Sequence, residues 1–361
     1  MIFHYPNPLV DNGRSASQIR PCKMKLSFEN IGYQVTCVVG YGKERKEAIA
    51  VIKKRIMKGE QFDFIYSESL TQPTLLSEKN HLPVYPFVDF SFFSYCKSKG
   101  IKTGLFYRDI YWRFDELYEA KSFFHSFIAK IFYYYDLVKY RGLDTIFLPS
   151  NEMASHIPIL DHSRCVELPP GTSKSDLNQT LSLADDQLIN VLYVGGLSDG
   201  YPMDVMFEAL SQCPYINFTL CTRIEDWQSY KKKNSIPSNV QVVHESGKSL
   251  EKLFKNAHIC SLFFEPQVWR EFAFPYKFFE YLSYDLPVIC VNDTPPSRIV
   301  NEHRLGWSIN YSLSELIALF NSLQKDNSSI VTASRKINEI KEQFSWESRA
   351  KFVENRLGKL C

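Results

Sequence analysis

The chain lacks several features that would place it quickly in a class of protein. Its 361 residues contain no uncharged apolar run of about 18 residues, the length that spans a bilayer. Its first residues lack the basic and apolar regions of a signal peptide. The nine cysteines form no C-x-x-C pair and no regular framework. We therefore expect reduced cysteines and a cytoplasmic protein.

Signatures of common catalytic and binding classes are also missing. No His, Cys and carboxylate cluster has metal-ligand spacing, and no Ser-His-Asp arrangement, Walker loop or G-x-G-x-x-G motif stands out. Lys and Arg number 42 against 40 Asp and Glu, a net charge of +2, which is too balanced for a dedicated nucleic-acid binder. We expect no metal, no cofactor and no nucleic-acid partner.

What is present is typical of a soluble globular protein with two domains. Hydrophobic residues make up 45% and charged residues 23%, and the length favours two domains with a cleft between them. Residues 1–168 carry 22 Lys and Arg against 18 Asp and Glu, so the positive charge lies in the first half. Much of it falls in residues 43–58, which form either a solvated helix face or a surface that attracts anionic lipid or a lipid-linked diphosphate.

Short apolar runs alternate with longer helical segments, the pattern of parallel α/β sheets. Residues 169–187, with Pro169-Pro-Gly followed by a polar stretch, have the composition of a linker. Residues 313–360 predict two or three helices, and Ser345 is the expected N-cap of the last. The predicted strands are residues 2–5, 34–39, 62–66, 102–106, 145–148 and 164–168, and then 189–194, 217–221, 240–243, 258–263 and 287–291.

The most informative pattern is F-P-Y-K-F-F-E-Y-L-S-Y-D-L-P-V-I-C-V, residues 274–291. Pro275 predicts a helix start beside a buried strand. Free amides at a helix N-terminus bind phosphate, and Lys277 in the first turn adds positive charge. Glu280 lies one turn later, where it can accept hydrogen bonds from ribose hydroxyls. In the alternative interpretation, Lys277 and Glu280 form an exposed i,i+3 ion pair.

This pattern resembles the donor-binding signature of GT-B glycosyltransferases of the family 4-like, group 1 type, P-x-K-x-F-E-Y-L-x-x-x-x-P-V, matched from Pro275 to Val288. Residues 189–197 are similar to the first strand and glycine turn of their second domain. The resemblance implies two Rossmann-like, doubly wound α/β domains facing across a cleft. It assigns residues 1–170 to acceptor binding, 171–188 to a linker and 189–340 to nucleotide-sugar binding, with a terminal helix, 341–361, packing back on the first domain.

The resemblance also implies donor-binding residues. Glu280 matches the ribose-binding glutamate, and the other matches are the helix start, the glycine turn, the base contacts and an N-terminal-domain loop: Pro275, Tyr276 and Lys277; Gly195 and Gly196; His244 and Glu245; and Gly13. Two departures stand out. The family's cationic pair after the glycine turn is missing, so Lys277 and Arg223 are expected to stabilise the leaving diphosphate. Phe272 occupies the place of a second glutamate, with Glu271 one residue out of register.

Polar side chains after the strand at residues 102–106 are the candidates for acceptor binding, because ligands bind at the carboxyl ends of such strands. Asp109 is the candidate base, and Trp112 is placed to stack on a sugar. In the alternative interpretation Arg108 and Asp109 form an ion pair and Trp112 only packs. His4 and His81 are candidates of lower rank. The expected acceptor residues are Arg14, Arg108, Trp112 and Arg113.

Aromatic residues reach 15% of the chain, with 27 Phe and 21 Tyr, and they are densest in residues 123–138. One helical stripe of this segment predicts packing against the first domain's sheet. In the other interpretation, Phe123 and Tyr134 contact a membrane interface or a prenyl chain. The predicted stripe is Phe124, Phe127, Ile128, Ile131, Tyr135 and Val138.

Together these features predict a metal-independent hexosyltransferase that transfers sugar from a UDP- or GDP-type donor to a hydroxyl of a glycan or lipid-linked glycan. The resemblance points to bacterial-type surface polysaccharide synthesis in the cytoplasm, with peripheral contact at the inner face of the membrane. Two alternatives stay open: a non-catalytic sugar-nucleotide-binding subunit, and a sugar-nucleotide epimerase on the same fold.

Overall fold

The computed structural model divides the chain into two compact units. Unit 1 comprises Met1–Gly171 and Trp346–Cys361, and unit 2 comprises Thr172–Ser345. The structure describes residues 1–11, 13, 15–114, 123–174, 181, 183, 188–197, 202–231 and 235–358.

Unit 1 is built on a six-stranded parallel sheet of order β2-β1-β3-β4-β5-β6. The chain reverses its direction of travel across this sheet between β1 and β3, which creates a switch point at their carboxyl ends. Strands β1 and β3, which flank the switch point, are buried along their whole length, as central parallel strands commonly are. The strands are β1 (Ile2–Tyr5), β2 (Thr36–Val39), β3 (Phe64–Glu68), β4 (Lys102–Phe106), β5 (Thr145–Leu148) and β6 (Cys165–Glu167).

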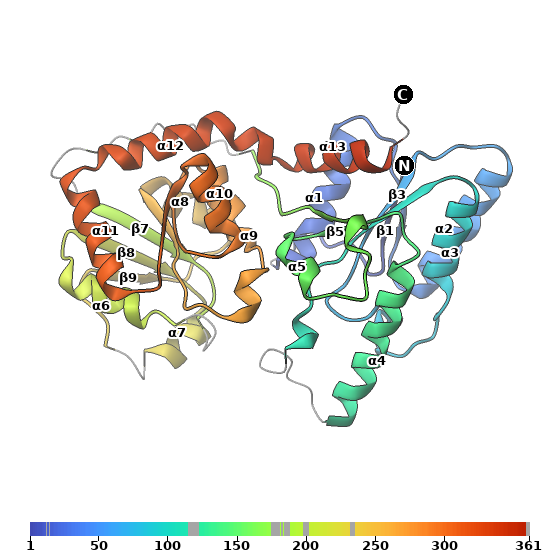
Figure 1. Cartoon of the computed structure of the whole chain (residues 1–361), viewed down its shortest axis with the longest axis horizontal. Helices are drawn as coiled ribbons and strands as arrows, with labels where there is room; N and C mark the ends of the chain where they lie inside the picture. Colours follow the sequence, from blue (N-terminus) through green and yellow to red (C-terminus); the bar gives the residue numbers. More distant parts are fainter. Residues whose placement is uncertain are drawn as a thin grey trace. The chain divides into compact units, whose positions relative to one another are not determined.

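Helices cover both faces of this sheet (Figure 1). On one face, α13 from the end of the chain lies beside α1, where Tyr33 donates a hydrogen bond to Glu354 at 2.8 Å. A Cβ atom on Gly104 would lie 2.5 Å from Leu357, so β4 and α13 pack closely. The helices are α1 (Ala16–Asn30), α2 (Gly42–Met57), α3 (Val88–Ser98), α4 (Phe123–Tyr140), α5 (Glu152–Ser155) and α13 (Trp346–Leu357).

Unit 2 repeats the plan with a second parallel sheet, of order β12-β11-β10-β7-β8-β9, whose switch point lies between β7 and β10. Its strands are β7 (Ile189–Val194), β8 (Ile216–Cys221), β9 (Val240–Val243), β10 (Ile259–Leu262), β11 (Val288–Val291) and β12 (Gly306–Ile309). Its helices are α6 (Asp204–Gln212), α7 (Ile224–Tyr230), α8 (Leu250–Asn256), α9 (Tyr276–Ser283), α10 (Pro295–His303), α11 (Leu313–Lys325) and α12 (Ser328–Ile340).

The predicted fold class is confirmed: two doubly wound α/β units, each with a parallel sheet and flanking helices. All eleven predicted strands are present, with ends shifted by at most two residues. The sequence interpretation missed β12, a short edge strand with no fully buried residue, because half-buried strands carry a weak apolar signal.

The predicted core stripe of α4 is wrong. Phe127, Ile131 and Val138 are 57%, 50% and 52% exposed. The helix instead buries Ala129, Tyr133, Asp136, Leu137 and Tyr140 against the sheet. The buried face includes polar side chains that form hydrogen bonds. Tyr133 donates to the Thr71 carbonyl, and Tyr140 donates to Asp136. The side chain of Phe124, and that of Phe123, lie outside the described residues.

Among the helices that the structure describes, none combines the length and apolarity needed to cross a bilayer. The described cysteines are free thiols, and Cys96, Cys213, Cys221, Cys260 and Cys290 are buried.

Candidate functional site

The candidate donor site lies at the switch point of unit 2, where α9 begins beside the carboxyl end of β7. Pro275 is the N-cap of α9, and the fixed φ of proline prepares the first turn. Four large residues of α9, Phe278, Phe279, Tyr281 and Leu282, are fully buried. The Tyr281 hydroxyl accepts a hydrogen bond from the Val194 amide at 3.1 Å, which ties the helix to β7. The opposite face of α9 therefore presents Lys277 and Glu280 at a fixed place.

Lys277 lies directly over the glycine turn that follows β7. Its Nζ donates to the Tyr193 hydroxyl at 3.2 Å, and that hydroxyl donates to the Gly196 carbonyl at 2.8 Å. A Cβ atom on Gly195 would lie 1.7 Å from Lys277 Nζ, so any larger residue at 195 would displace the ammonium group. A side chain at position 195 would therefore compete with Lys277 for the same space.

Burial lowers the pKa of Lys277 from 10.5 to about 8. The negative charge of Glu280 opposes this shift, whereas the positive charges of Arg270 and Arg223 reinforce it. Two arginines therefore act on Lys277 near the end of β7 and make its positive charge more costly. A bound anion would relieve that repulsion and return the lysine pKa toward its ordinary value.

Glu280 is half-buried one helical turn after Lys277. Burial raises the pKa of its carboxyl, and the Lys277 charge offsets part of that rise. Within the part of the chain that the structure describes, no group donates a hydrogen bond to this carboxylate. The pair is not the exposed ion pair of the alternative interpretation, because both side chains are partly withdrawn from water.

Arg270 is the residue that the sequence interpretation missed. It lies in the short 3₁₀ helix Val268–Glu271, which connects β10 to α9, and it is buried. Its guanidinium lies 4.8 Å from the ring centre of Phe264 and 4.5 Å from that of Trp269. Stacking on both rings fixes its direction. In the sequence only the adjacent Trp269 marks this arginine, because Phe264 lies six residues earlier.

The other predicted donor residues lie at the carboxyl ends of the neighbouring strands. Arg223 follows β8, is 77% exposed, and contacts Asp226 at 3.8 Å beside Gly196. His244 follows β9, is exposed, and its Nδ1 lies 2.8 Å from the Thr222 carbonyl oxygen. Glu245 is exposed next to it. The strand order β7-β8-β9 thus places Gly195, Arg223 and His244 along one edge of the sheet.

A buried phenylalanine, Phe272, stands where the family has its second glutamate. Phe272 is 1% exposed, and Glu271 is an exposed residue at the end of the 3₁₀ helix. Tyr276, the first residue of α9, is half-buried.

Unit 1 holds a cavity of about 710 Å³ at its own switch point. Residues following three strands line it: Tyr5 of β1, Thr71 after β3 and Arg108 after β4. Gln18 also lines it, and a Cβ atom on Gly13 would lie 2.4 Å from the Gln18 Cβ, so glycine is required there for packing within unit 1. The remaining lining is mostly hydroxyl, amide and charged groups, including Asn7, Ser17, Tyr41, Gln72, Ser77, Glu78, Lys79 and His81.

Arg108 is held at the cavity by Glu68 and not by Asp109. Its Nη2 lies 3.4 Å from Glu68, whose carboxylate also accepts from Arg20 at 3.1 Å and from Tyr66 at 2.8 Å. Two guanidinium groups therefore share one fully buried carboxylate. One positive charge is left over at this group, and Arg108 is the member that lines the cavity.

Two residues that were predicted to bind the acceptor, Trp112 and Arg113, are not among the described residues that line the cavity. Trp112 is 2% exposed, stacks on Tyr133 at 4.7 Å, and donates to the Tyr107 hydroxyl, so it is a packing residue in this structure. Arg113 donates to the His156 carbonyl at the surface, outside the lining of the cavity. Arg14, which was also predicted to bind the acceptor, lies outside the described residues.

Asp109 is buried behind the cavity wall. Burial raises its pKa from 3.8 to about 6, while Arg108 and hydrogen bonds from Thr71 and the Tyr111 backbone oppose the rise. Among the described residues, its Oδ1 has no hydrogen-bond partner. Thr71 lines the cavity, and Asp109 is not among the described residues that do.

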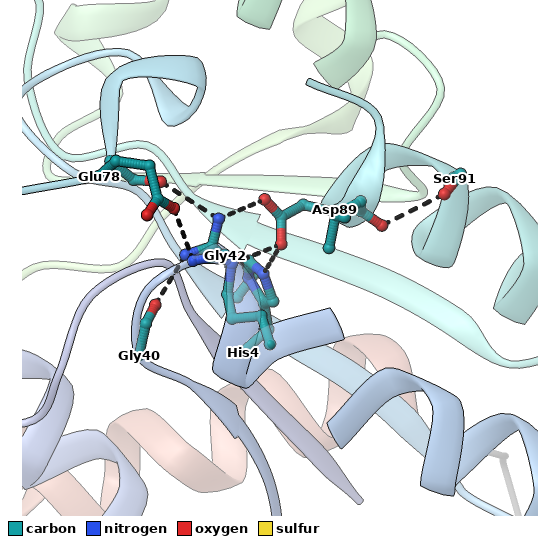
Figure 2. Close-up of polar contacts among 10 residues, drawn as sticks. His4, Gly40, Gly42, Glu78, Asp89 and Ser91 are labelled. Carbon is teal, nitrogen blue, oxygen red and sulfur yellow. Dashed lines mark hydrogen bonds and ion pairs between the residues drawn. The ribbon is translucent and has the colours of Figure 1, made fainter. Parts of the chain in front are cut away.

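His4 belongs to a buried charge network with Asp89 and Arg45 (Figure 2). Its Nε2 lies 2.9 Å from Asp89, and its Nδ1 lies 2.7 Å from Ser67. Arg45 binds both oxygens of Asp89, at 2.8 and 2.9 Å, so this arginine of α2 is part of the core and not of a solvated face. Burial alone would raise the pKa of Asp89, but His4 and Arg45 hold it at about 2.

Each unit has a doubly wound parallel sheet with its own switch point, and the chain has the GT-B fold. Among solved structures, Anabaena HepE in complex with UDP aligns with a TM-score of 0.66 at 11% identity, over 99% of this chain and 100% of that one. A glycosyltransferase from Rickettsia africae ESF-5 aligns at 0.64 with 12% identity, over 99% of both chains. Sucrose-phosphate synthase from Thermosynechococcus elongatus aligns at 0.65 with 12% identity, over 98% and 97%. No protein-family profile and no curated protein sequence matches the chain.

Proposed function

We propose that this protein is a metal-independent hexosyltransferase, which moves a sugar from a UDP- or GDP-sugar to a hydroxyl of a glycan or lipid-linked glycan. The observation that carries the proposal is the position of Lys277 in the first turn of α9, beside Gly195 and within the field of Arg270 and Arg223. HepE, which shares the fold, has been solved with UDP-glucose. A role in surface polysaccharide synthesis is part of the same proposal.

In the proposed donor complex, the diphosphate lies at the N-terminus of α9. The free amides of the first turn and the positive side chains hold it there. Glu280 accepts hydrogen bonds from the ribose hydroxyls, a role that suits a carboxylate without a donor of its own. His244 and Glu245 lie further along the sheet edge and contact the base.

The cations promote transfer because negative charge grows on the leaving group. The bond from the anomeric carbon to the diphosphate oxygen breaks, and that oxygen gains charge while the acceptor hydroxyl forms the new bond and loses its proton. Charge stabilisation that strengthens along this path lowers the barrier. Lys277, Arg270 and Arg223 are proposed to provide it.

The acceptor is proposed to bind in the cavity of unit 1. Its hydroxyl and amide groups suit sugar hydroxyls, and the positive charge of Arg108 with Lys79 suits a phosphate on a lipid-linked glycan. Asp109 is proposed to orient Thr71 toward the acceptor, because it reaches the cavity through that residue.

The test is donor turnover. We expect the protein to hydrolyse a UDP- or GDP-hexose slowly without acceptor, and Lys277→Ala to lower that rate by roughly 10²-fold or more, as loss of a group stabilising the departing charge does. The exposed Lys252→Ala in the same unit is the matched control. Binding without turnover for every donor and acceptor would favour the binding subunit instead, and conversion of the donor to its epimer would favour an epimerase. No binding of any nucleotide sugar would overturn all three.

A further inference from the structure

Two buried aromatic side chains pack together at the switch point of unit 2. Tyr193 lies near the end of β7, and Phe264 follows β10, the strand that pairs with β7. Their ring centres are 5.4 Å apart, and the ring planes are inclined at 78°. Edge-to-face packing of this kind is favourable, so each ring fixes the other. These two rings are called the aromatic platform below.

Lys277 contacts the Tyr193 side of the aromatic platform in two ways. Its Nζ lies 4.6 Å from the centre of the Tyr193 ring, and it donates to the Tyr193 hydroxyl at 3.2 Å. The ring attracts the ammonium group through its quadrupole, and the hydroxyl adds a hydrogen bond with a fixed direction. The same hydroxyl donates to the Gly196 carbonyl at 2.8 Å. Tyr193 therefore fixes the lysine and the glycine turn together.

Arg270 contacts the Phe264 side of the aromatic platform. Its guanidinium lies 4.8 Å from the centre of the Phe264 ring, and the ring of Trp269 also contacts it, at 4.5 Å. An aromatic ring carries no net charge, so it holds a cation without adding negative charge to the site. The positive charge of Arg270 still acts on Lys277, because it helps to lower the pKa of that group. The platform thus holds two cations that repel each other.

We infer that Tyr193 and Phe264 are positioning residues of the donor site, which hold Lys277 and Arg270 ready for the diphosphate of a nucleotide sugar. The inference rests on the proposed function. Two cations that repel each other turn away toward water unless the fold holds them. Cations that are fixed before the donor binds need no reorganisation when it binds or when charge develops on the leaving group. The platform therefore contributes to donor affinity although it contacts the donor only through the cations.

The first test measures the pKa of Lys277 with no nucleotide present, by trace acetylation of the lysines across a pH series and mass spectrometry of the peptides. Tyr193→Phe removes a hydroxyl that accepts from the ammonium group, so the pKa should fall below the wild-type value of about 8. Phe264→Leu frees Arg270 to move away, so the pKa should rise. Both variants leave in place the other groups that act on Lys277, namely Glu280, Arg223 and Cys221.

The opposite signs of these two shifts distinguish positioning from loss of packing. Burial lowers the pKa of Lys277, so a loosened core would admit water and raise that pKa in both variants. A rise in both variants, or no shift in either, would overturn the inference.

The second test is calorimetric titration of UDP and GDP at pH 7, with circular dichroism to establish that each variant is folded. Tyr193→Phe and Phe264→Leu should each weaken nucleotide binding roughly threefold to tenfold. Two matched controls change the same residue types elsewhere in unit 2 and should bind as the wild type does. Tyr215→Phe removes a hydroxyl that donates to Asn321, and Phe207→Leu shortens a buried ring that packs on Phe218.

The outcomes separate this inference from the proposed function. Wild-type affinity in both platform variants, or an equal loss in the controls, would overturn the inference and leave the donor site standing. A wild-type protein that binds neither nucleotide would overturn the proposed function and, with it, the role of the platform in donor binding, even with both pKa shifts as expected.

Discussion

The two units carry the same sheet plan but treat charge in opposite ways. In unit 1, buried arginines are matched to buried carboxylates: Arg45 binds Asp89, and Arg20 and Arg108 share Glu68. In unit 2, Lys277 lies near Arg270 and Arg223; burial lowers the pKa of Lys277, and the two arginine charges lower it further. Unit 1 thus pairs its buried arginines with carboxylates and leaves one positive charge over, whereas unit 2 places three cations near one turn.

The difference indicates what each switch point is built for. A neutralised network holds the surrounding backbone in place, and in unit 1 it leaves a cavity lined largely by uncharged polar groups. Accumulated positive charge costs folding free energy unless an anion binds. The cations of unit 2 therefore support the proposed diphosphate site, and the polar cavity of unit 1, with Arg108 and Lys79 in its lining, supports the proposed glycan acceptor.

The largest expected effect comes from breaking the neutralised network. Asp89→Ala leaves the Arg45 guanidinium, 1% exposed, without its partner, and should lower the free energy of unfolding by about 3–5 kcal/mol. Urea unfolding measures this. Glu60→Ala removes the partner of Arg55 in an exposed pair and should lower the free energy of unfolding far less, because solvent screens an exposed pair. Equal losses in the two variants would show that the buried network does not hold unit 1 together.

A second change should stabilise unit 1. The folded-state pKa of Asp109, about 6, lies above the ordinary value of 3.8, so ionisation destabilises the fold, and the penalty grows as pH rises from 3.8 to 6. Asp109→Asn should therefore add about 2–3 kcal/mol near pH 8 and about half of that near pH 5. Thermal unfolding at both pH values measures the gain.

The control for that prediction is Asp144→Asn. Asp144 accepts hydrogen bonds from the Thr103 amide and hydroxyl, so its loss should not stabilise the protein. A gain from Asp109→Asn that is the same at both pH values would contradict the assigned pKa.

A smaller effect tests the accumulated charge of unit 2. Arg270→Ala should weaken UDP or GDP binding roughly tenfold, the usual cost of losing one charged contact. It should also raise the pKa of Lys277 above about 8, because Arg270 repels that ammonium group. Calorimetric titrations across a pH series report both, with the exposed Arg335→Ala as control. An unchanged affinity would remove Arg270 from the site.

The sequence predicted the fold through features that are local. Alternation of apolar strands with helices gave both sheets, because buried parallel strands are apolar along their whole length. Pro275 and the buried residues after it placed α9 and its Lys277 and Glu280. Such features depend on neighbours in the chain, so one sequence is enough to find them.

What the sequence could not provide depends on contacts between distant residues. The apolar residues of α4 occur on more than one face, and only the positions of Thr71 and the sheet select Tyr133 and not Ile131 for burial. Arg108 lies beside Asp109 in sequence, yet it pairs with Glu68 on another strand. Arg270 was missed because its effect on Lys277 arises through space.

The central claim, that unit 2 binds a nucleoside diphosphate through Lys277, is tested most directly by calorimetric titration of UDP and GDP into the wild type, Lys277→Met and Lys252→Met. Because Lys277 is charged below its pKa of about 8, wild-type affinity should fall as pH rises through that value, with proton uptake on binding. Lys277→Met should bind at least tenfold more weakly and lose this pH dependence, while Lys252→Met should match the wild type. Equal affinity and equal pH dependence in wild type and Lys277→Met would contradict the claim.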